Sequence, residues 1–231
     1  MSKEAERQYA CKVDQEYLFK KPFNEPRVFR EFALILEIFG QRLSRGSILD
    51  MGCGSGWTSL WLARAGYSVV GVDISDRMIE IARERSIAEN TPADFVVGDM
   101  EDVDLARQDF DGVLFFDCLH HCPEYKKALK RSHAHLRTGG VILLMETTWL
   151  HRYSPHARET TRQYGVSELG FTRRQLRRAL KEAGFTRICF VHDPGPGYKG
   201  VSGFLKAMAR VCCEYFLFFP QAKNIVVAEK G

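Results

Sequence analysis

The chain has no long hydrophobic run, although 45% of its 231 residues are hydrophobic. No apolar stretch approaches the roughly 20 residues that a membrane-spanning helix needs. The first ten residues, MSKEAERQYA, carry charges and lack the apolar core of a secretory signal. These absences predict a cytoplasmic protein without a transmembrane segment. The hydrophobic content is ordinary for one sizeable globular domain.

A strong excess of one charge is also missing, because the formal net charge is only +4. The densest basic run, at 173–181, has four arginines and one lysine at helical spacing, which is typical of a solvated helix face. Nucleic acid is therefore a disfavoured partner. The seven cysteines are odd in number, and some lie in apolar runs. They indicate free thiols in a reducing compartment and not a disulfide framework.

Short apolar runs alternate with helical patterns along most of the chain. Several runs, such as GVLFFD and VILLME, are continuously apolar, as in strands that are covered on both faces. The expected strands are 47–51, 68–72, 94–97, 112–117, 141–146, 187–192 and 225–228. Helices are expected at 57–65, from Ser75, from Pro123 to about 136, and from Thr172 to 183. This rhythm predicts an α/β fold with a mostly parallel sheet.

A glycine-rich turn, DMGCGSG at 50–56, closes the first expected strand and opens a helix. Glycines there allow positive φ and let a ligand approach the backbone. The spacing is Gly-x-Gly-x-Gly, whereas a dinucleotide loop needs Gly-x-Gly-x-x-Gly. The bulky Trp57 that follows also fits a phosphate loop poorly. An NAD-dependent oxidoreductase is therefore disfavoured.

Three acidic residues narrow the choice of ligand. Asp73 ends the second expected strand, where a carboxylate can accept hydrogen bonds from ribose hydroxyls. Asp99 ends the third, and can accept from an adenine amino group while Met100 packs on the ring. Asp50 beside the glycines would repel a phosphate but suit an ammonium and a sulfonium. These features predict S-adenosylmethionine, a nucleoside with a cationic tail and no phosphate.

Five motifs in order resemble the class I methyltransferases, within the broad group often called methyltransferase type 11. They are ILDMGCGSGW, VVGVDIS, FVVGDMED, FDGVLFFDCLHH and LRTGGVILLME, and they span about 46–146. The resemblance implies a Rossmann-like, three-layer α/β/α sandwich. Its seven-stranded sheet would be mostly parallel with an antiparallel last strand, and helical or aromatic cap insertions would be added.

The resemblance also implies roles for particular residues. Gly52, Gly54 and Gly56, together with Asp50, would hold the methionine part. Asp73 and Ile74 would contact the ribose region, and Asp99 and Met100 the adenine. Cys118 and Leu119 would line the side that faces the methyl group, and Tyr17 would close over the cofactor from the N-terminal segment.

His120 and His121 follow the fourth expected strand, at the edge where ligands bind in such sheets. Either could be a general base, which methyl transfer needs only if the acceptor must lose a proton. The alternative is that these histidines only shape the pocket. The segment CLHHC at 118–122 also holds four metal-ligand types, but one short turn does not easily wrap a tetrahedral ion. We therefore expect no metal.

Three segments fall outside the strand–helix rhythm of this single domain. Residues 1–45 are expected to form a helical cap or lid on the core at 46–146. Residues 147–171 and 193–223 are expected to be substrate-cap insertions, since long insertions in compact folds are usually functional or disordered. Within the last one, 203–219 has one polar stripe on a wide apolar surface. It would pack on the protein's own cap, form a homodimer interface or touch a membrane peripherally.

The sequence therefore predicts an S-adenosylmethionine-dependent methyltransferase acting on a small or medium-sized acceptor. The first choice is an oxygen acceptor on a sugar, a glycan lipid or a secondary metabolite. Methylation of a protein or tRNA, and a catalytically silent scaffold subunit, remain alternatives. The insertions that would select the acceptor match no motif with a physical interpretation.

Overall fold

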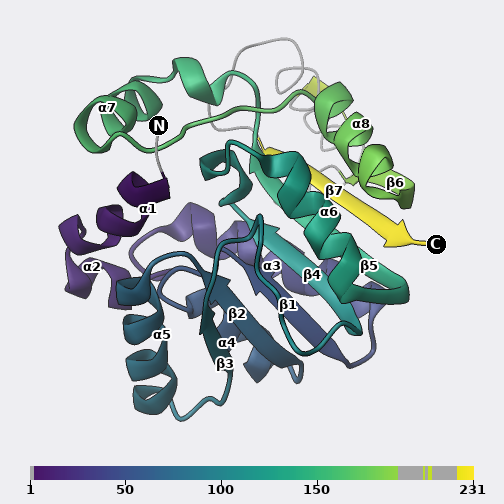
Figure 1. Ribbon diagram of the computed structural model, residues 1–231, viewed down its shortest axis with the longest axis horizontal. Helices are drawn as coiled ribbons and strands as arrows, with labels where there is room; N and C mark the ends of the chain where they lie inside the picture. The colour runs from purple at the N-terminus through teal and green to yellow at the C-terminus, as the bar shows by residue number, and fades with distance from the viewer. Residues whose placement is uncertain (1–2, 192–204, 206–207, 210–222) are drawn as a thin grey trace.

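The structure, a computed structural model, describes residues 3–191, 205, 208–209 and 223–231. Its centre is a seven-stranded sheet in the order β3-β2-β1-β4-β5-β7-β6 (Figure 1). The strands are β1 (Ser47–Met51), β2 (Ser68–Asp73), β3 (Asp94–Val97), β4 (Phe110–Phe116), β5 (Leu136–Thr147), β6 (Phe185–Val191) and β7 (Lys223–Lys230). Each expected strand is present, and five of them are longer than expected.

The strand directions confirm the predicted mixed sheet. Strands β1 to β5 pair in parallel, whereas β7 runs antiparallel to both β5 and β6. In the centre, Asp50 of β1 stands opposite Gly71 of β2 and Leu114 of β4. The carboxyl ends of β1, β2 and β4 therefore meet at one edge of the sheet, which is where open α/β sheets bind ligands.

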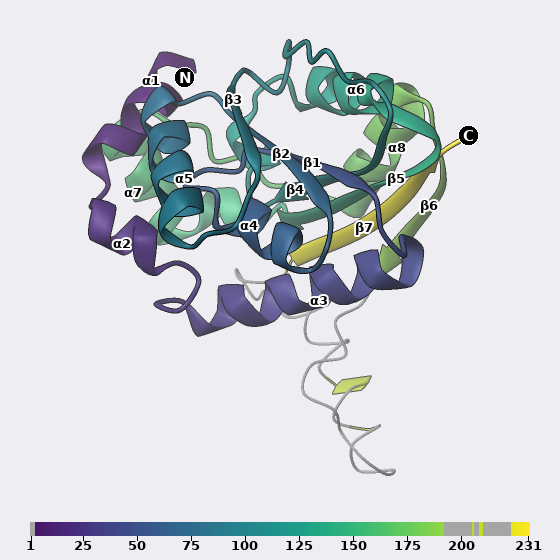
Figure 2. The same cartoon turned by 90° about the horizontal axis from the view of Figure 1, so that it is seen from below.

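Helices cover both faces of the sheet, so the predicted three-layer sandwich is confirmed (Figure 2). Phe32 and Phe39 of α3 and Trp57 of α4 pack with one set of buried strand residues. Leu129 of α6 and Leu180 of α8 pack with the other set. The helix bounds are α3 (Pro26–Arg42), α4 (Trp57–Arg64), α5 (Asp76–Ala88), α6 (Tyr125–His135) and α8 (Arg173–Ala183).

Local sequence signals explain where these helices begin and end. The Ser75 side chain accepts a hydrogen bond from the backbone N–H of Met78 at the start of α5. Thr172 and Gln175 form a reciprocal capping box at the start of α8. Gly184 ends α8 with φ 102°, a conformation that favours glycine.

Two segments lie together beside the binding edge of the sheet. The N-terminal segment forms α1 (Lys3–Tyr9) and α2 (Gln15–Lys20), and the insertion after β5 forms α7 (Pro155–Tyr164). The rings of Tyr9 and Tyr164 pack edge to face with centroids 5.1 Å apart, which joins α1 to α7. Nearly all of the expected cap insertion at 193–223, with its amphipathic stretch at 203–219, lies outside the described residues. None of the helices in the described ranges has the length and apolar content to cross a membrane.

Candidate functional site

The loop between β1 and α4 depends on its glycines. Gly52, Gly54 and Gly56 all have positive φ, at 71°, 51° and 77°. A Cβ on Gly52 would lie 2.7 Å from Cβ of Cys118, so this position has no room for a side chain. A Cβ on Gly54 would meet nothing within 4 Å. The backbone at Gly54 is therefore open to a ligand.

Asp73, at the end of β2, holds this loop in place. Its Oδ2 accepts a hydrogen bond from the N–H of Gly54 at 2.9 Å, and its Oδ1 accepts from the N–H of Ser75 at 2.9 Å. Burial raises the pKa of Asp73, although these N–H donors act against the shift. Because a carboxylate has about four acceptor sites, the two oxygens can still receive hydroxyl donors.

Asp50 lies beneath the loop, since only 1% of its surface is exposed. Its Oδ2 accepts hydrogen bonds of 2.6 Å from the hydroxyls of Thr58 and Ser59 on α4. Burial raises the pKa of Asp50 to about 6, against the effect of these donors. Asp50 does not line the cavity, whereas Thr58, whose hydroxyl donates to Asp50, does.

Asp99 follows β3 and forms an ion pair with Lys3, a residue near the N-terminus. Nζ of Lys3 lies 2.5 Å from Oδ2 of Asp99 and 2.6 Å from Oε2 of Glu101. Partial burial opposes the charge on Lys3, but hydrogen bonds to both carboxylates raise its pKa well above the ordinary value. The ammonium therefore bonds to the same carboxylate that would receive an adenine amino group.

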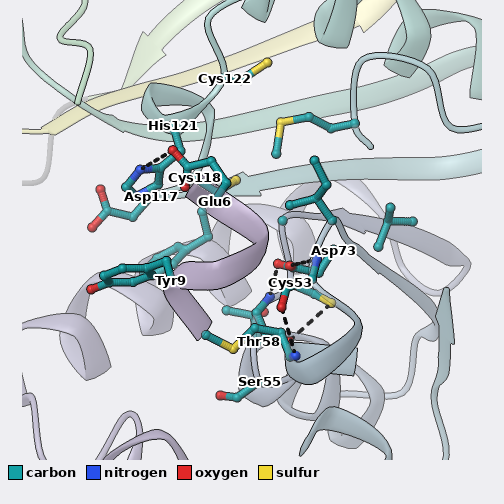
Figure 3. A pocket seen from close by; sticks show the side chains of 18 of the residues that line it. Glu6, Tyr9, Cys53, Ser55, Thr58, Asp73, Asp117, Cys118, His121 and Cys122 are labelled. Carbon is teal, nitrogen blue, oxygen red and sulfur yellow. Dashed lines mark hydrogen bonds and ion pairs between the residues drawn. The ribbon is translucent and has the colours of Figure 1, made fainter. Parts of the chain in front are cut away.

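These elements enclose a cavity of about 270 Å³ at the carboxyl edge of the sheet (Figure 3). The loop side chains and Asp73 lie on one side, and Asp117, Cys118 and His121 lie on the other. Helix α1 crosses the opening and contributes Glu6 and Tyr9. The volume is close to the lower limit of about 300 Å³ for small-molecule sites, in agreement with a cavity covered by α1.

His121 lines the cavity in a defined tautomer. Its Nδ1 lies 2.9 Å from the carbonyl oxygen of Ser167, which can only accept, so Nδ1 carries the proton and Nε2 is an acceptor. Burial, and then the nearby charge of His120, lower the pKa of His121 to about 4. The ring is therefore neutral at pH 7. Figure 3 shows Glu6 of α1 facing this ring, with Oε1 3.8 Å from Nδ1. Burial raises the pKa of Glu6 to about 7.

His120 does not line the cavity and is held by Glu146. Its Nδ1 lies 2.9 Å from Oε2 of Glu146, whose Oε1 accepts the N–H groups of Cys118 and Leu119 at 2.9 and 2.7 Å. Burial lowers the pKa of His120, but the bond to Glu146 and the surrounding carboxylates outweigh it, so the pKa is raised. His120 and Glu146 together fix the turn that carries Cys118 and His121.

The sequence around this site matches a known protein family. Residues 48–140 match the family model described as a methyltransferase domain. The chain contains a class I methyltransferase domain. The matched segment runs from β1 through the glycine loop, Asp73, Asp99 and the histidine pair to the start of β5.

The methyltransferase domain is similar to curated proteins over part of their length. The ubiquinone biosynthesis O-methyltransferase of Paramagnetospirillum magneticum is 34% identical over 97 residues, which cover 42% of this chain and 39% of that protein. The magnesium-protoporphyrin O-methyltransferase of Rhodobacter capsulatus is 34% identical over 135 residues, covering 54% of this chain and 59% of that protein. The chain thus spans 39 to 59% of the length of these two relatives.

Solved structures support the fold over nearly the whole chain. A protein from Pyrococcus horikoshii OT3 has a TM-score of 0.66 at 21% identity, covering 92% of this chain and 93% of that one. Phosphoethanolamine N-methyltransferase 2 from Haemonchus contortus, solved with S-adenosyl-L-methionine, has a TM-score of 0.66 at 19% identity, covering 94% of this chain and 60% of that one. At these identities the likeness concerns the fold alone.

Within the methyltransferase domain, most of the residues expected at the site line one cavity. Those that do so are Gly52, Gly54, Asp73, Ile74, Asp99, Met100, Cys118 and His121. Their individual roles stay predictions.

Five expected site residues do not line the cavity: Asp50, Gly56, Leu119, Tyr17 and His120. Leu119 is fully buried in the core, and Gly56 is packed on Ala82 and Phe95. Tyr17 is 40% exposed, and its hydroxyl is bound to Glu25.

The structure adds cavity residues that the sequence patterns did not single out. Asp117 follows β4 and forms an ion pair with Lys223 of β7, which lowers the pKa of Asp117 although burial opposes ionisation. Its place at a strand end is a signal that could have identified it. Lys3, Glu6 and Ser167 carry no such signal, because only the return of α1 and the insertion after β5 brings them to the cavity.

Proposed function

We propose that the protein is an S-adenosylmethionine-dependent methyltransferase that transfers the methyl group to an oxygen of a small or medium-sized molecule. The observation that carries the proposal is one cavity in which the open glycine loop, Asp73 and the histidine-bearing turn after β4 face one another. The cofactor would supply an electrophilic methyl group on a sulfonium. The chain's own residues have to bind it, orient it and exclude water.

The cavity residues fit this cofactor. The Gly54 backbone is open for the methionine part, and Asp73 offers acceptor sites to ribose hydroxyls. Asp99 and Met100 form a place for the adenine ring once Asp99 is released from Lys3. Asp50 lies under Thr58 of the cavity wall and adds negative charge, which favours a cationic tail.

The acceptor would enter on the side of His121. Its neutral ring can accept a proton at Nε2, and the buried hydroxyl of the neighbouring Ser167 has no hydrogen-bond partner among the described residues. Unsatisfied buried polar groups are costly, so a polar acceptor is favoured there. The cofactor would supply its methyl group to the acceptor oxygen and would retain the electron pair of the carbon–sulfur bond. The hydroxyl proton passes to Nε2 of His121 and then to water.

Two observations favour a small oxygen acceptor over a protein or tRNA. Helix α1 crosses the cavity opening and leaves limited space for a polymer (Figure 3). The two relatives named above carry O-methyltransferase names with small-molecule acceptors. Which sugar, lipid or metabolite is methylated depends on segments such as 193–223, most of which lie outside the described residues.

Calorimetric titration with S-adenosylhomocysteine, with NAD as the control ligand, tests the cofactor. We expect micromolar binding of S-adenosylhomocysteine, at least tenfold weaker in Asp73→Ala, and no binding of NAD. Transfer of labelled methyl groups to a panel of hydroxyl, amine and carboxyl acceptors then tests the reaction. Cofactor binding without transfer to any acceptor would favour the silent scaffold, and binding of NAD alone would overturn the proposal.

A further inference from the structure

Behind His121, side chains from two separate segments converge. His120 belongs to the turn after β4, whereas His151 and Glu168 belong to the insertion after β5. Oε2 of Glu168 lies 2.6 Å from Nε2 of His151 and 3.8 Å from Nε2 of His120. The rings of His120 and His121 have centroids 4.2 Å apart. Three imidazoles and one carboxylate therefore meet in a largely buried place next to the cavity.

His120 and His121 are each held through the ring nitrogen Nδ1. Nδ1 of His120 is bound to the Glu146 carboxylate, and Nδ1 of His121 is bound to the Ser167 carbonyl. Nε2 of His120 then faces Oε2 of Glu168, and among the described residues Nε2 of His121 is left for another partner. Histidines that ligate metals almost always have the other ring nitrogen bound to a carboxylate or a backbone carbonyl in this way.

We propose that His120, His121 and Glu168 form a binding site for one divalent transition-metal ion. One ligand atom from each of the three lies within 4.8 Å of the others. Two ligands on a tetrahedral ion lie about 3.4 Å apart when each bond is about 2.1 Å long. The 3.8 Å between Nε2 of His120 and Oε2 of Glu168 therefore needs only a small adjustment. His151 would then orient the Glu168 carboxylate.

The donor set decides which ions fit. Two imidazole nitrogens and one carboxylate oxygen suit zinc, iron, cobalt or nickel, whereas magnesium and calcium prefer oxygen ligands alone. The surroundings favour a cation, because the buried carboxylate of Glu146 on β5 is bound to the other ring nitrogen of His120. Zinc is the ion that we expect to bind most readily among those that are commonly available.

From the sequence we expect no metal, because the five residues 118–122 alone do not easily surround an ion. The structure agrees that their two cysteines do not belong to a site. The Cys118 thiol lies 2.9 Å from the Met51 carbonyl oxygen, and the Cys122 thiol lies 3.3 Å from Oε1 of Glu101. The third ligand proposed here, Glu168, is more than forty residues away in the sequence and could not be paired with the histidines from spacing alone.

The ion would occupy Nε2 of His121, the atom that the proposed base uses, so the metal-bound protein would not use His121 as a base. The site itself can be tested without an acceptor. The full-length protein is freed of metal by chelation and titrated with Co²⁺, followed by visible absorption, and with Zn²⁺, followed by calorimetry. We expect one ion per chain and d–d absorption typical of a coordinated Co²⁺ ion. His121→Ala and Glu168→Gln should each weaken Zn²⁺ binding at least tenfold. Glu146→Gln, which changes a partner of a ligand, should weaken it about 10- to 100-fold.

His156→Ala is the matched control, since His156 lies on α7 with an exposed side chain, and it should bind Zn²⁺ as the wild type does. Circular dichroism and S-adenosylhomocysteine titration of each variant report whether the fold and the cofactor site persist. Absence of stoichiometric Co²⁺ and Zn²⁺ binding in the wild type would overturn the proposal. So would equal Zn²⁺ affinity in folded His121→Ala or folded Glu168→Gln. If the wild type does not bind S-adenosylhomocysteine, the proposed function is contradicted, whereas the proposed metal site is not.

Discussion

Nζ of Lys3 lies 2.5 Å from Oδ2 of Asp99, although 95 residues separate the two along the chain. Asp99 is the carboxylate that we expect to receive the adenine amino group. The N-terminal helix therefore bonds to one end of the cofactor site while it crosses the cavity. Binding of the cofactor has to break this contact or shift it to Glu101, the second partner of Lys3.

We expect Lys3→Met to raise the affinity for S-adenosylhomocysteine about two- to fivefold. The variant removes the competing ammonium, and a partly exposed ion pair of this kind contributes up to about 1 kcal/mol. Lys20→Met is the control, because Lys20 is paired with Glu16 on α2 and is exposed. Titration calorimetry of the three proteins checks the prediction. Unchanged or weaker binding in Lys3→Met would mean that Lys3 does not compete with the cofactor.

Two glycines of the loop should respond differently to alanine. Gly52→Ala places a Cβ 2.7 Å from Cβ of Cys118 at positive φ, so we expect about 2 to 4 kcal/mol of lost stability and little binding. Gly54→Ala has positive φ but open space, so we expect about 1 kcal/mol of lost stability. Its Cβ should nevertheless weaken cofactor binding at least tenfold. Urea unfolding and S-adenosylhomocysteine titration separate the two effects. Equal stability of the two variants would contradict the loop geometry.

The buried negative charge of Asp50 should lower the free energy of unfolding of the ligand-free protein at neutral pH. The pKa of Asp50 is about 6 in the folded state against an ordinary 3.8, so folding favours the protonated form. Stability is therefore lost as pH rises from about 4 to about 6, and the loss is complete above that range. Asp50→Asn keeps an acceptor for the Thr58 and Ser59 hydroxyls but has no charge to bury.

We expect Asp50→Asn to be about 1 to 3 kcal/mol more stable than the wild type at pH 7.5 and nearly equal to it at pH 4. Its affinity for S-adenosylmethionine should fall, because the negative charge beneath the cavity is gone. Chemical unfolding at both pH values tests the first part. Asp94→Asn, an exposed change at the start of β3, is the control. A variant less stable than the wild type at pH 7.5 would show that the charge on Asp50 is well solvated or compensated.

Asp73 and Asp50 show how far the sequence predicts this site. Asp73 lines the cavity, since a residue at a strand end next to a glycine loop has little choice of position, and its contact with the ribose stays a prediction. Asp50 precedes the loop by two residues, but its side-chain direction depends on two hydroxyls of α4 that it binds beneath the loop. Periodicity predicts the strands and helices, whereas a side chain's direction depends on such tertiary contacts.

The rest of the site comes from contacts between distant segments. The bond between Glu6 and the Ser167 N–H and the packing of Tyr9 on Tyr164 place α1 over the cavity. Neither contact has a local signal, since both join segments about 160 residues apart. The lid function of residues 1–45 therefore remains a prediction, and truncation of residues 1–25 followed by cofactor titration and turnover tests it.

His121 should act as the proton acceptor of the reaction. In protein kept free of metal, His121→Gln should lower kcat for a hydroxyl acceptor about 10²- to 10³-fold, because general-base catalysis contributes about this much. Affinity for S-adenosylhomocysteine should stay within about threefold, since glutamine retains a donor for the Ser167 carbonyl. His156→Gln should have wild-type kcat. If metal-free wild type is inactive and Zn²⁺ restores turnover, the ion and not the free imidazole activates the acceptor. Equal kcat in metal-free wild type and His121→Gln would instead limit His121 to shaping the cavity.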